Sequence, residues 1–318
     1  MNGDRQCLSK AITLVESHQE NDRSLAKQLM SRIQAVGTSM RIGITGPPGV
    51  GKSSLIEALG LEMIHESQQR LAVLSIDPSS AQTQGSILGD KTRMIQLSQS
   101  DLVFIRPSPS GTQLGGIAKN TRETIRLCEA AGYRYILVET AGIGQTEYLV
   151  STMTDLTILM HLPGSGDDVQ GIKRGVMEWA DLMVVNKADQ PEDQRVINTL
   201  KDLHSVLHFL PGRGHGYTPK VLSVSALNKK GIPELWGEIK AFEKHINENG
   251  YILINRKQQL VNSFRQQLPL RLWESMLVMP GVKQNLEDTE EKILSEDLSP
   301  EEAVDLLQDF IFASLRTK

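Results

Sequence analysis

Hydrophobic positions along this chain switch repeatedly between two spacings, which predicts strands that alternate with helices. Apolar runs of strand length occur at 40–45, 71–76, 102–105, 135–138, 156–162, 182–185 and 221–224. Apolar residues three or four positions apart, the spacing of helices, separate most of these runs, at 53–66, 89–99, 116–131, 169–180 and 192–209. Such alternation is typical of βαβ units, so we expect an α/β fold, a mostly parallel sheet with helices on both faces.

Both ends of the chain show helical spacing only. Residues 4–36 predict two helices with a break and cap at Asn21–Ser24. After Gly250 no further strand is predicted, and Ser299–Glu302 has the sequence of a capping box with proline at the first helical position. The apolar stripe of these last helices fits either a wrap on the sheet or an arm that is buried on a second subunit. We therefore divide the chain into an N-terminal helical segment (1–39), a central α/β domain (40–249) and a C-terminal helical arm (250–318).

The strongest motif joins the first predicted strand to the first predicted helix of the central domain. Residues 46–53 read G-P-P-G-V-G-K-S, the G-x-x-x-x-G-K-S pattern of a phosphate-binding loop. Its glycines let the backbone turn N–H groups toward phosphate oxygens, Lys52 reaches the β- and γ-phosphates, and the Ser53 hydroxyl can hold Mg²⁺. The motif predicts a P-loop NTPase whose nucleotide is bound by Gly46, Pro47, Pro48, Gly49, Val50, Gly51, Lys52, Ser53 and Ser54.

Carboxylates at the ends of other predicted strands are candidate magnesium ligands. Glu139 ends one strand, and beside a phosphate loop an acid in this place typically holds Mg²⁺, often through water. The N–H of Gly142 can approach the γ-phosphate, so we assign catalytic roles to Lys52, Glu139 and Gly142. Asp77 ends another strand and Asp90 follows in a loop, and each either completes the magnesium shell or caps the next helix.

Two further loops predict that the base is guanine. Asn186–Asp189 reads N-K-A-D, an N-K-x-D sequence at a strand end. Asp189 can accept two hydrogen bonds from guanine, whereas adenine lacks both donors and would leave a buried carboxylate unpaired. Lys187 would lie over the base, and Asn186 would tie this segment to the phosphate loop. The second base loop is expected after the next strand, at Ser225, Ala226 and Leu227. The expected nucleotide is therefore GTP or GDP.

Composition argues against several other classes of function. The net charge of −4 argues against a general binder of nucleic acids or membrane surfaces. No apolar run reaches the length of a bilayer span and the first ten residues lack a signal core, so we expect a soluble, cytoplasmic protein. Cys7 and Cys128 provide neither a disulfide framework nor a paired-cysteine metal site. His204 and His208 lie four apart but have no third ligand, so we interpret them as surface or packing residues.

Several longer strings in the chain resemble those of one protein family. They are Asp77–Ser80, Gly85–Met94, Phe104–Pro107, Leu127–Gly132, Glu139–Glu147 and Gln170–Lys173. Over nearly its whole length the sequence is similar to the MeaB/ArgK family, the G-protein chaperones of adenosylcobalamin-dependent methylmalonyl-CoA mutase and its relatives. The chain departs from the family's usual residues at Gln84, at Asp168 and Val169, and by an added Gln113.

The resemblance implies a GTPase that docks on the mutase, gates the loading of its cofactor and protects the holoenzyme from inactivation. It implies that Asp77, Asp90 and Glu139 belong to the Mg²⁺ site, and that 163–174 relays the nucleotide state to the mutase. The relay residues that we expect are Gln145, Gln170 and Lys173. The family is also expected to form homodimers through its C-terminal helices, which favours the arm for residues 250–318.

Two other functions are open from the residues alone. A kinase would pass the γ-phosphate of GTP or ATP to a transport component, and it would need an acceptor base that the sequence does not reveal. A metal-insertion GTPase for nickel or zinc would need a cluster of cysteine and histidine ligands, which the sequence does not show. We therefore prefer a GTP hydrolase that acts as a mutase chaperone.

Overall fold

The computed structural model describes residues 4–17, 19–33, 39–77, 94–109, 114–140, 146–164, 177–207 and 213–316. The chain forms two compact units, Met1–Leu260 and Val261–Lys318. Among the helices of the described ranges, none is long and apolar enough to cross a membrane.

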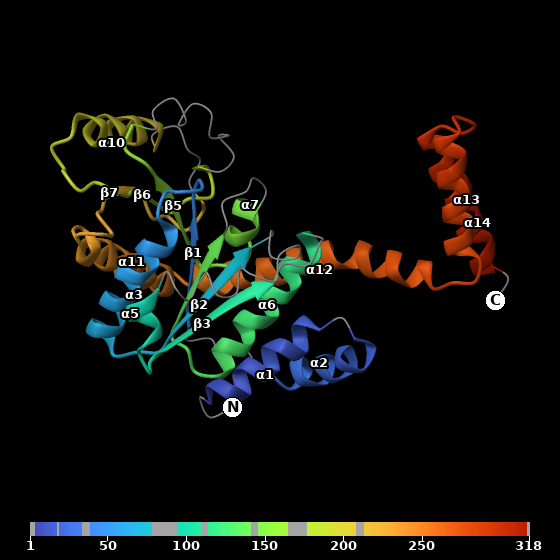
Figure 1. Ribbon diagram of the computed structural model, residues 1–318, viewed down its shortest axis with the longest axis horizontal. Coiled ribbons are helices and arrows are strands. Elements are labelled where there is room, and N and C mark those ends of the chain that lie inside the picture. Colours follow the sequence, from blue (N-terminus) through green and yellow to red (C-terminus); the bar gives the residue numbers. More distant parts are fainter. Residues whose placement is uncertain are drawn as a thin grey trace. The chain divides into compact units, whose positions relative to one another are not determined.

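The first unit is built on one sheet of seven strands in the order β3-β2-β4-β1-β5-β6-β7 (Figure 1). The strands are β1 (Met40–Thr45), β2 (Leu71–Asp77), β3 (Val103–Pro109), β4 (Tyr135–Thr140), β5 (Leu156–His161), β6 (Leu182–Val185) and β7 (Lys220–Ser223). Each neighbouring pair is parallel, and β1 lies between β4 and β5. The crossover direction reverses at β1, so a ligand is expected at the carboxyl ends of these three strands. The predicted parallel α/β fold is confirmed.

Helices cover both faces of the sheet because the strand side chains alternate between two apolar clusters. Ile42 and Ile44 of β1 point into the cluster that holds Leu55 and Trp236, whereas Val138 of β4 points into the opposite one. The first face carries α3 (Lys52–Ser67), α5 (Ile95–Ser98) and α11 (Ile232–Glu248). The other face carries α6 (Leu114–Ala130), α7 (Thr146–Ser151) and α10 (Gln194–Leu207).

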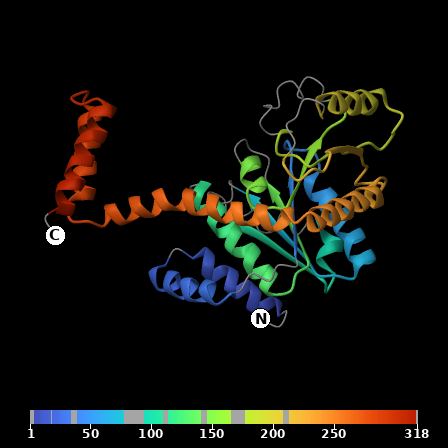
Figure 2. The ribbon, with the colours of Figure 1, turned by 180° about the vertical axis from the view of Figure 1, so that it is seen from behind.

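Two N-terminal helices, α1 (Arg5–Glu16) and α2 (Glu20–Arg32), lie beside α6 (Figure 2). The prediction of two helices is confirmed, but the predicted break at Asn21–Ser24 is wrong because these residues lie inside α2. The chain turns between α1 and α2 instead, where the Ser17 hydroxyl donates to the Asp22 carboxylate at 2.6 Å. A carboxylate in the first turn of a helix is stabilised by the helix dipole, so Asp22 fits inside α2.

The second unit contains only helices in its described residues. Helix α12 (Tyr251–Leu277) continues into it from the first unit, and α13 (Val282–Leu294) and α14 (Pro300–Arg316) follow. Val282, Leu307 and Ile311 form the small core between α13 and α14. The predicted capping box is confirmed: the Ser299 N–H donates to Glu302 at 3.1 Å, and the Glu302 N–H donates to the Ser299 hydroxyl at 3.3 Å.

Candidate nucleotide site

The loop that connects β1 to α3 has the backbone geometry of an anion cradle. Gly46 and Gly51 have φ angles of 150° and 92°, which favour glycine. A Cβ at Gly46 would lie 2.7 Å from the Met160 carbonyl oxygen, and one at Gly51 would lie 2.6 Å from the Asn186 amide nitrogen. Only glycine therefore lets this loop pass so close to β5 and to the N-K-A-D segment. The N-terminus of α3 follows directly, and its N–H groups and dipole favour a phosphate.

Lys52 and Ser53 bring the predicted catalytic and metal-binding atoms together in this loop. Lys52 is only 7% exposed, and its ammonium donates to the carbonyl oxygens of Gly46 and Pro47 at 2.8 and 3.0 Å. The Ser53 hydroxyl donates to Glu139 Oε1 at 2.9 Å, and Glu139 itself is 6% exposed at the end of β4. A hydroxyl and a carboxylate oxygen at this spacing are hard donors of the kind that Mg²⁺ prefers, so the residues fit the ion.

The other predicted metal and relay residues lie partly or wholly outside the described residues. Asp77 is the last residue of β2 and pairs with Pro109 of β3. The preceding residue, Ile76, pairs with Thr140 of β4. The backbone of Asp77 therefore lies at the carboxyl edge of the sheet, near Glu139. Its side chain lies outside the described part. The remaining predictions that lie outside the described ranges are Asp90, Gly142, Gln145, Gln170 and Lys173.

Asn186 links the two predicted base loops to the phosphate loop. Its side-chain amide donates to the Val50 carbonyl oxygen at 2.8 Å, and its Oδ1 accepts from the Ala226 N–H at 3.2 Å. Lys187 takes a left-handed conformation, with φ at 61°. The structure thus places the 186–189 segment, the loop at 225–227 and the phosphate loop around one space at the carboxyl edge.

Asp189 differs from the sequence expectation of a buried carboxylate, because it is exposed in the protein by itself. The Ser225 hydroxyl and, at 3.5 Å, the Asn228 amide donate to its Oδ1. These two donors hold the carboxylate in place without covering it. Leu227 is also exposed, whereas Ser225 and Ala226 are buried. A bound base would therefore be the group that removes the Asp189 carboxylate from water.

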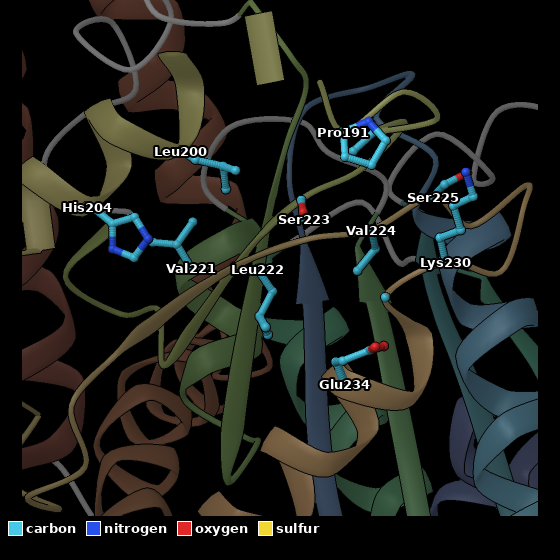
Figure 3. A pocket seen from close by; sticks show the side chains of 12 residues that line it. Pro191, Leu200, His204, Val221, Leu222, Ser223, Val224, Ser225, Lys230 and Glu234 are labelled. Carbon is cyan, nitrogen blue, oxygen red and sulfur yellow. The ribbon is translucent and has the colours of Figure 1, made fainter. Parts of the chain in front are cut away.

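A cavity of about 420 Å³ lies beside the base loops, along the last strand of the sheet. Figure 3 shows Leu200 and His204 of α10 on one side of β7, with Lys230 and Glu234 on the other. His204 is exposed, as predicted for a surface residue. Within the described ranges, no group of three histidine, cysteine, aspartate or glutamate residues could hold a metal ion.

Comparison with known proteins identifies the family of this chain. Residues 8–278 match the sequence model of the family described as methylmalonyl Co-A mutase-associated GTPase MeaB. The chain belongs to the MeaB family. It is 42% identical to a putative GTPase of Caulobacter vibrioides over 96% of this chain and 93% of that protein. It is 40% identical to GTPase ArgK of Escherichia coli over 97% and 93% of the two chains.

Two further comparisons extend the similarity to an animal protein and to a solved structure. The chain is 40% identical to the methylmalonic aciduria type A homolog, mitochondrial, of Mus musculus over 96% of this chain and 76% of that protein. A crystal structure described as LAO/AO transport system kinase is similar with a TM-score of 0.76 and 34% identity, over 98% and 94% of the two chains. As a MeaB-family member the chain is a GTP hydrolase with a bound guanine nucleotide.

Two features of this MeaB-family GTPase were not expected from its sequence. The hydroxyls of Thr45 and Thr140 lie 3.0 Å apart and join the last residues of β1 and β4. The sequence offered a signal for this pair, since a threonine ends each of two strands that flank the phosphate site. His161 ends β5, is 1% exposed, and has no hydrogen-bond partner for either ring nitrogen among the described residues. Burial lowers its pKa to about 4.

Proposed function

We propose that this GTPase is a chaperone of an adenosylcobalamin-dependent methylmalonyl-CoA mutase, or of a related acyl-CoA mutase, that gates cofactor loading and protects the mutase. The observation that supports this most directly is the family match over residues 8–278, since the family is described as mutase-associated. The name of the mouse relative, which refers to methylmalonic aciduria, points to the same metabolism. The proposal includes the cytoplasmic location that is expected from the sequence.

The geometry around the phosphate loop supports hydrolysis of the γ-phosphate by an in-line water. Lys52, which bridges two loop carbonyls, would turn its ammonium to the β- and γ-phosphate oxygens and neutralise the charge that develops there. Ser53 and Glu139 would hold Mg²⁺, with Asp77 and Asp90 as further ligands, and the ion would add positive charge at the same oxygens. Gly142 would offer its N–H to the γ-phosphate, and Asp189 would select guanine.

The proposal extends to partner contacts and to the division of the chain. Residues 1–39 would form an N-terminal helical segment, 40–249 the GTPase domain and 250–318 a dimerisation arm. Gln145, Gln170 and Lys173 would relay the nucleotide state to the mutase. Within the second unit, Val304, Leu306, Phe312 and Leu315 of α14 are exposed, which supports a homodimer through the C-terminal helices.

A kinase that acts on a transport component is the second candidate, because the similar crystal structure carries that description. One experiment separates the two functions: GTP turnover by the purified protein alone, with a methylmalonyl-CoA mutase from the same source, and with candidate transport proteins. Acceleration of phosphate release by the mutase supports the chaperone. Transfer of labelled phosphate to a transport protein, with no response to the mutase, would replace the chaperone with the kinase.

A further inference from the structure

Helix α7 and the turn that follows it pack directly on the strand that carries the phosphate loop. Gly43 of β1 lies three residues before Gly46, and a Cβ at Gly43 would lie 2.2 Å from Val150 Cγ1 and 3.0 Å from Thr154 Oγ1. At its other end α7 begins at Thr146, immediately after the 141–145 connection from β4. The helix and its turn are thus joined to both segments that we expect to contact the γ-phosphate.

The same turn is held from its other side by the first half of α12. Arg256 Nε and Nη2 donate to the two carboxylate oxygens of Asp155 at 2.9 and 2.6 Å. Gln259 Nε2 donates to the Thr154 carbonyl oxygen at 2.7 Å. Asp155 is 1% exposed and Gln259 is 7% exposed. We call these contacts between Arg256 and Asp155 and between Gln259 and Thr154 the α12 clamp.

Further buried charges surround the α12 clamp. The Arg41 N–H donates to Asp155 at 2.9 Å, and the Arg41 guanidinium donates to both oxygens of Glu129 at 2.8 and 2.9 Å. Glu129 also lies 3.7 Å from Arg256, so two arginines and two carboxylates balance each other. Attachment of a helix alone does not require such a network, since apolar residues of similar volume are often as stabilising. Two-point arginine–carboxylate pairs depend on geometry, which makes the clamp sensitive to a small shift of the turn.

We propose that the α12 clamp couples the nucleotide state to α12. A change around the γ-phosphate would move α7 against Gly43, shift Thr154 and Asp155, and so change how firmly α12 is held. This inference rests on the proposed function, in which the segment after Glu139 responds to GTP. Coupling between two sites is reciprocal, so a weakened clamp must also change the preference between GTP and GDP. Through the α12 clamp, the attachment of α12 would depend on which nucleotide occupies the phosphate site. Helix α12 continues into the second unit.

The first test measures amide hydrogen exchange in α12 of the full chain. The backbone N–H groups of 255–260 are compared with GDP bound and with a non-hydrolysable GTP analogue bound. We expect at least a fivefold difference in exchange rate between the two states. Equal rates, in a protein that binds both nucleotides, would overturn the coupling.

The reciprocal test measures the ratio of the Kd values for GDP and the GTP analogue in clamp variants. We expect Gln259→Leu and Arg256→Gln to change this ratio by about fivefold or more, whereas Lys257→Gln, at an exposed position of the same helix, leaves it unchanged. Arg256→Gln leaves the buried Asp155 carboxylate without its arginine, so Gln259→Leu decides the test if Arg256→Gln does not fold. A lower Tm with an unchanged ratio would mean that the clamp is only structural, and would overturn the inference.

The outcomes also separate this inference from the proposed function. Normal GTP turnover and a normal response to the mutase, together with nucleotide-independent exchange in α12, would contradict the coupling alone. Failure to bind or hydrolyse GTP would contradict both.

Discussion

We expect hydrolysis to depend most directly on the side chain of Lys52. Its ammonium donates to the Gly46 and Pro47 carbonyl oxygens, which hold it inside the loop where the phosphates are expected. We expect Lys52→Ala to lower GTP turnover at saturating nucleotide by roughly 100- to 1000-fold, the usual cost of losing one group that stabilises transition-state charge. Phosphate release at several GTP concentrations measures the turnover of the variant. A turnover within threefold of the parent would contradict a catalytic role for Lys52.

We expect Asp189 to set the base preference, because its exposed carboxylate is held by Ser225 and Asn228 and makes no ion pair with a cation among the described contacts. Asp189→Asn keeps the shape but replaces one acceptor with an N–H donor. We expect GTP affinity to fall by roughly 10- to 100-fold and xanthosine triphosphate, whose O2 accepts that donor, to bind better. Competition binding with both nucleotides measures the change. A retained preference for guanine would show that another group reads the base.

His161 makes stability depend on pH. Its pKa is lowered to about 4 by burial, whereas an unfolded histidine titrates near 6.5. Between these values the unfolded chain binds more protons, so stability falls as the pH drops through this window. We expect the titration of His161 alone to lower the free energy of unfolding by about 1.4 kcal/mol when the pH falls from 7.5 to 5.5.

The matched variant for this prediction is His161→Leu, which replaces the imidazole with an apolar side chain of similar size in β5. Urea unfolding at both pH values should show a smaller loss of stability at pH 5.5 in the variant than in the parent. The other histidines are common to both proteins and cancel in the comparison. An identical pH dependence in the two proteins would mean that the pKa of His161 does not differ between the folded and unfolded states.

Helix α7 is held on β1 by a contact that only a glycine at position 43 permits. We expect Gly43→Ala to destabilise the first unit by about 1–3 kcal/mol, because the added methyl overlaps Val150. Val150→Ala should relieve that overlap, so the double variant should be more stable than the sum of the two single changes predicts. Chemical unfolding of the four proteins measures the coupling, and strictly additive effects would show that α7 simply moves aside.

Most strands of this sheet were predictable because each is a short apolar run whose residues are largely buried. Leu156–His161 and Leu182–Val185 show this directly, since all their residues are buried. Helix α7 was not predictable, because its six residues are too few for helical spacing to emerge. The phosphate loop could be read from local spacing alone. The α12 clamp could not, since Asp155 and Arg256 lie 101 residues apart and only the fold brings them together.

The second unit bears on assembly of the whole molecule. Leu307 and Ile311 of α14 are buried against α13, whereas Phe312 is 49% exposed. If this residue is part of a dimer contact, Phe312→Glu should shift the protein to monomers at micromolar concentration, because a charge would be buried at the interface. Sedimentation velocity over a range of concentrations measures this. Phe312→Leu is the control that should stay dimeric, and an unchanged dimer in Phe312→Glu would place the contact elsewhere.

The central place of β1 in the sheet also determines when the nucleotide site can first exist during synthesis. Both neighbours of β1, β4 and β5, are translated after it, and the Asn186 amide that binds the Val50 carbonyl comes later still. Synthesis from Gly46 to Ala226 takes roughly 10–40 s at ordinary translation rates. Throughout this interval the glycine-rich loop has emerged without the strands that support it. GTP can therefore stabilise the domain only after the ribosome has passed β7, and earlier folding must proceed without help from the ligand.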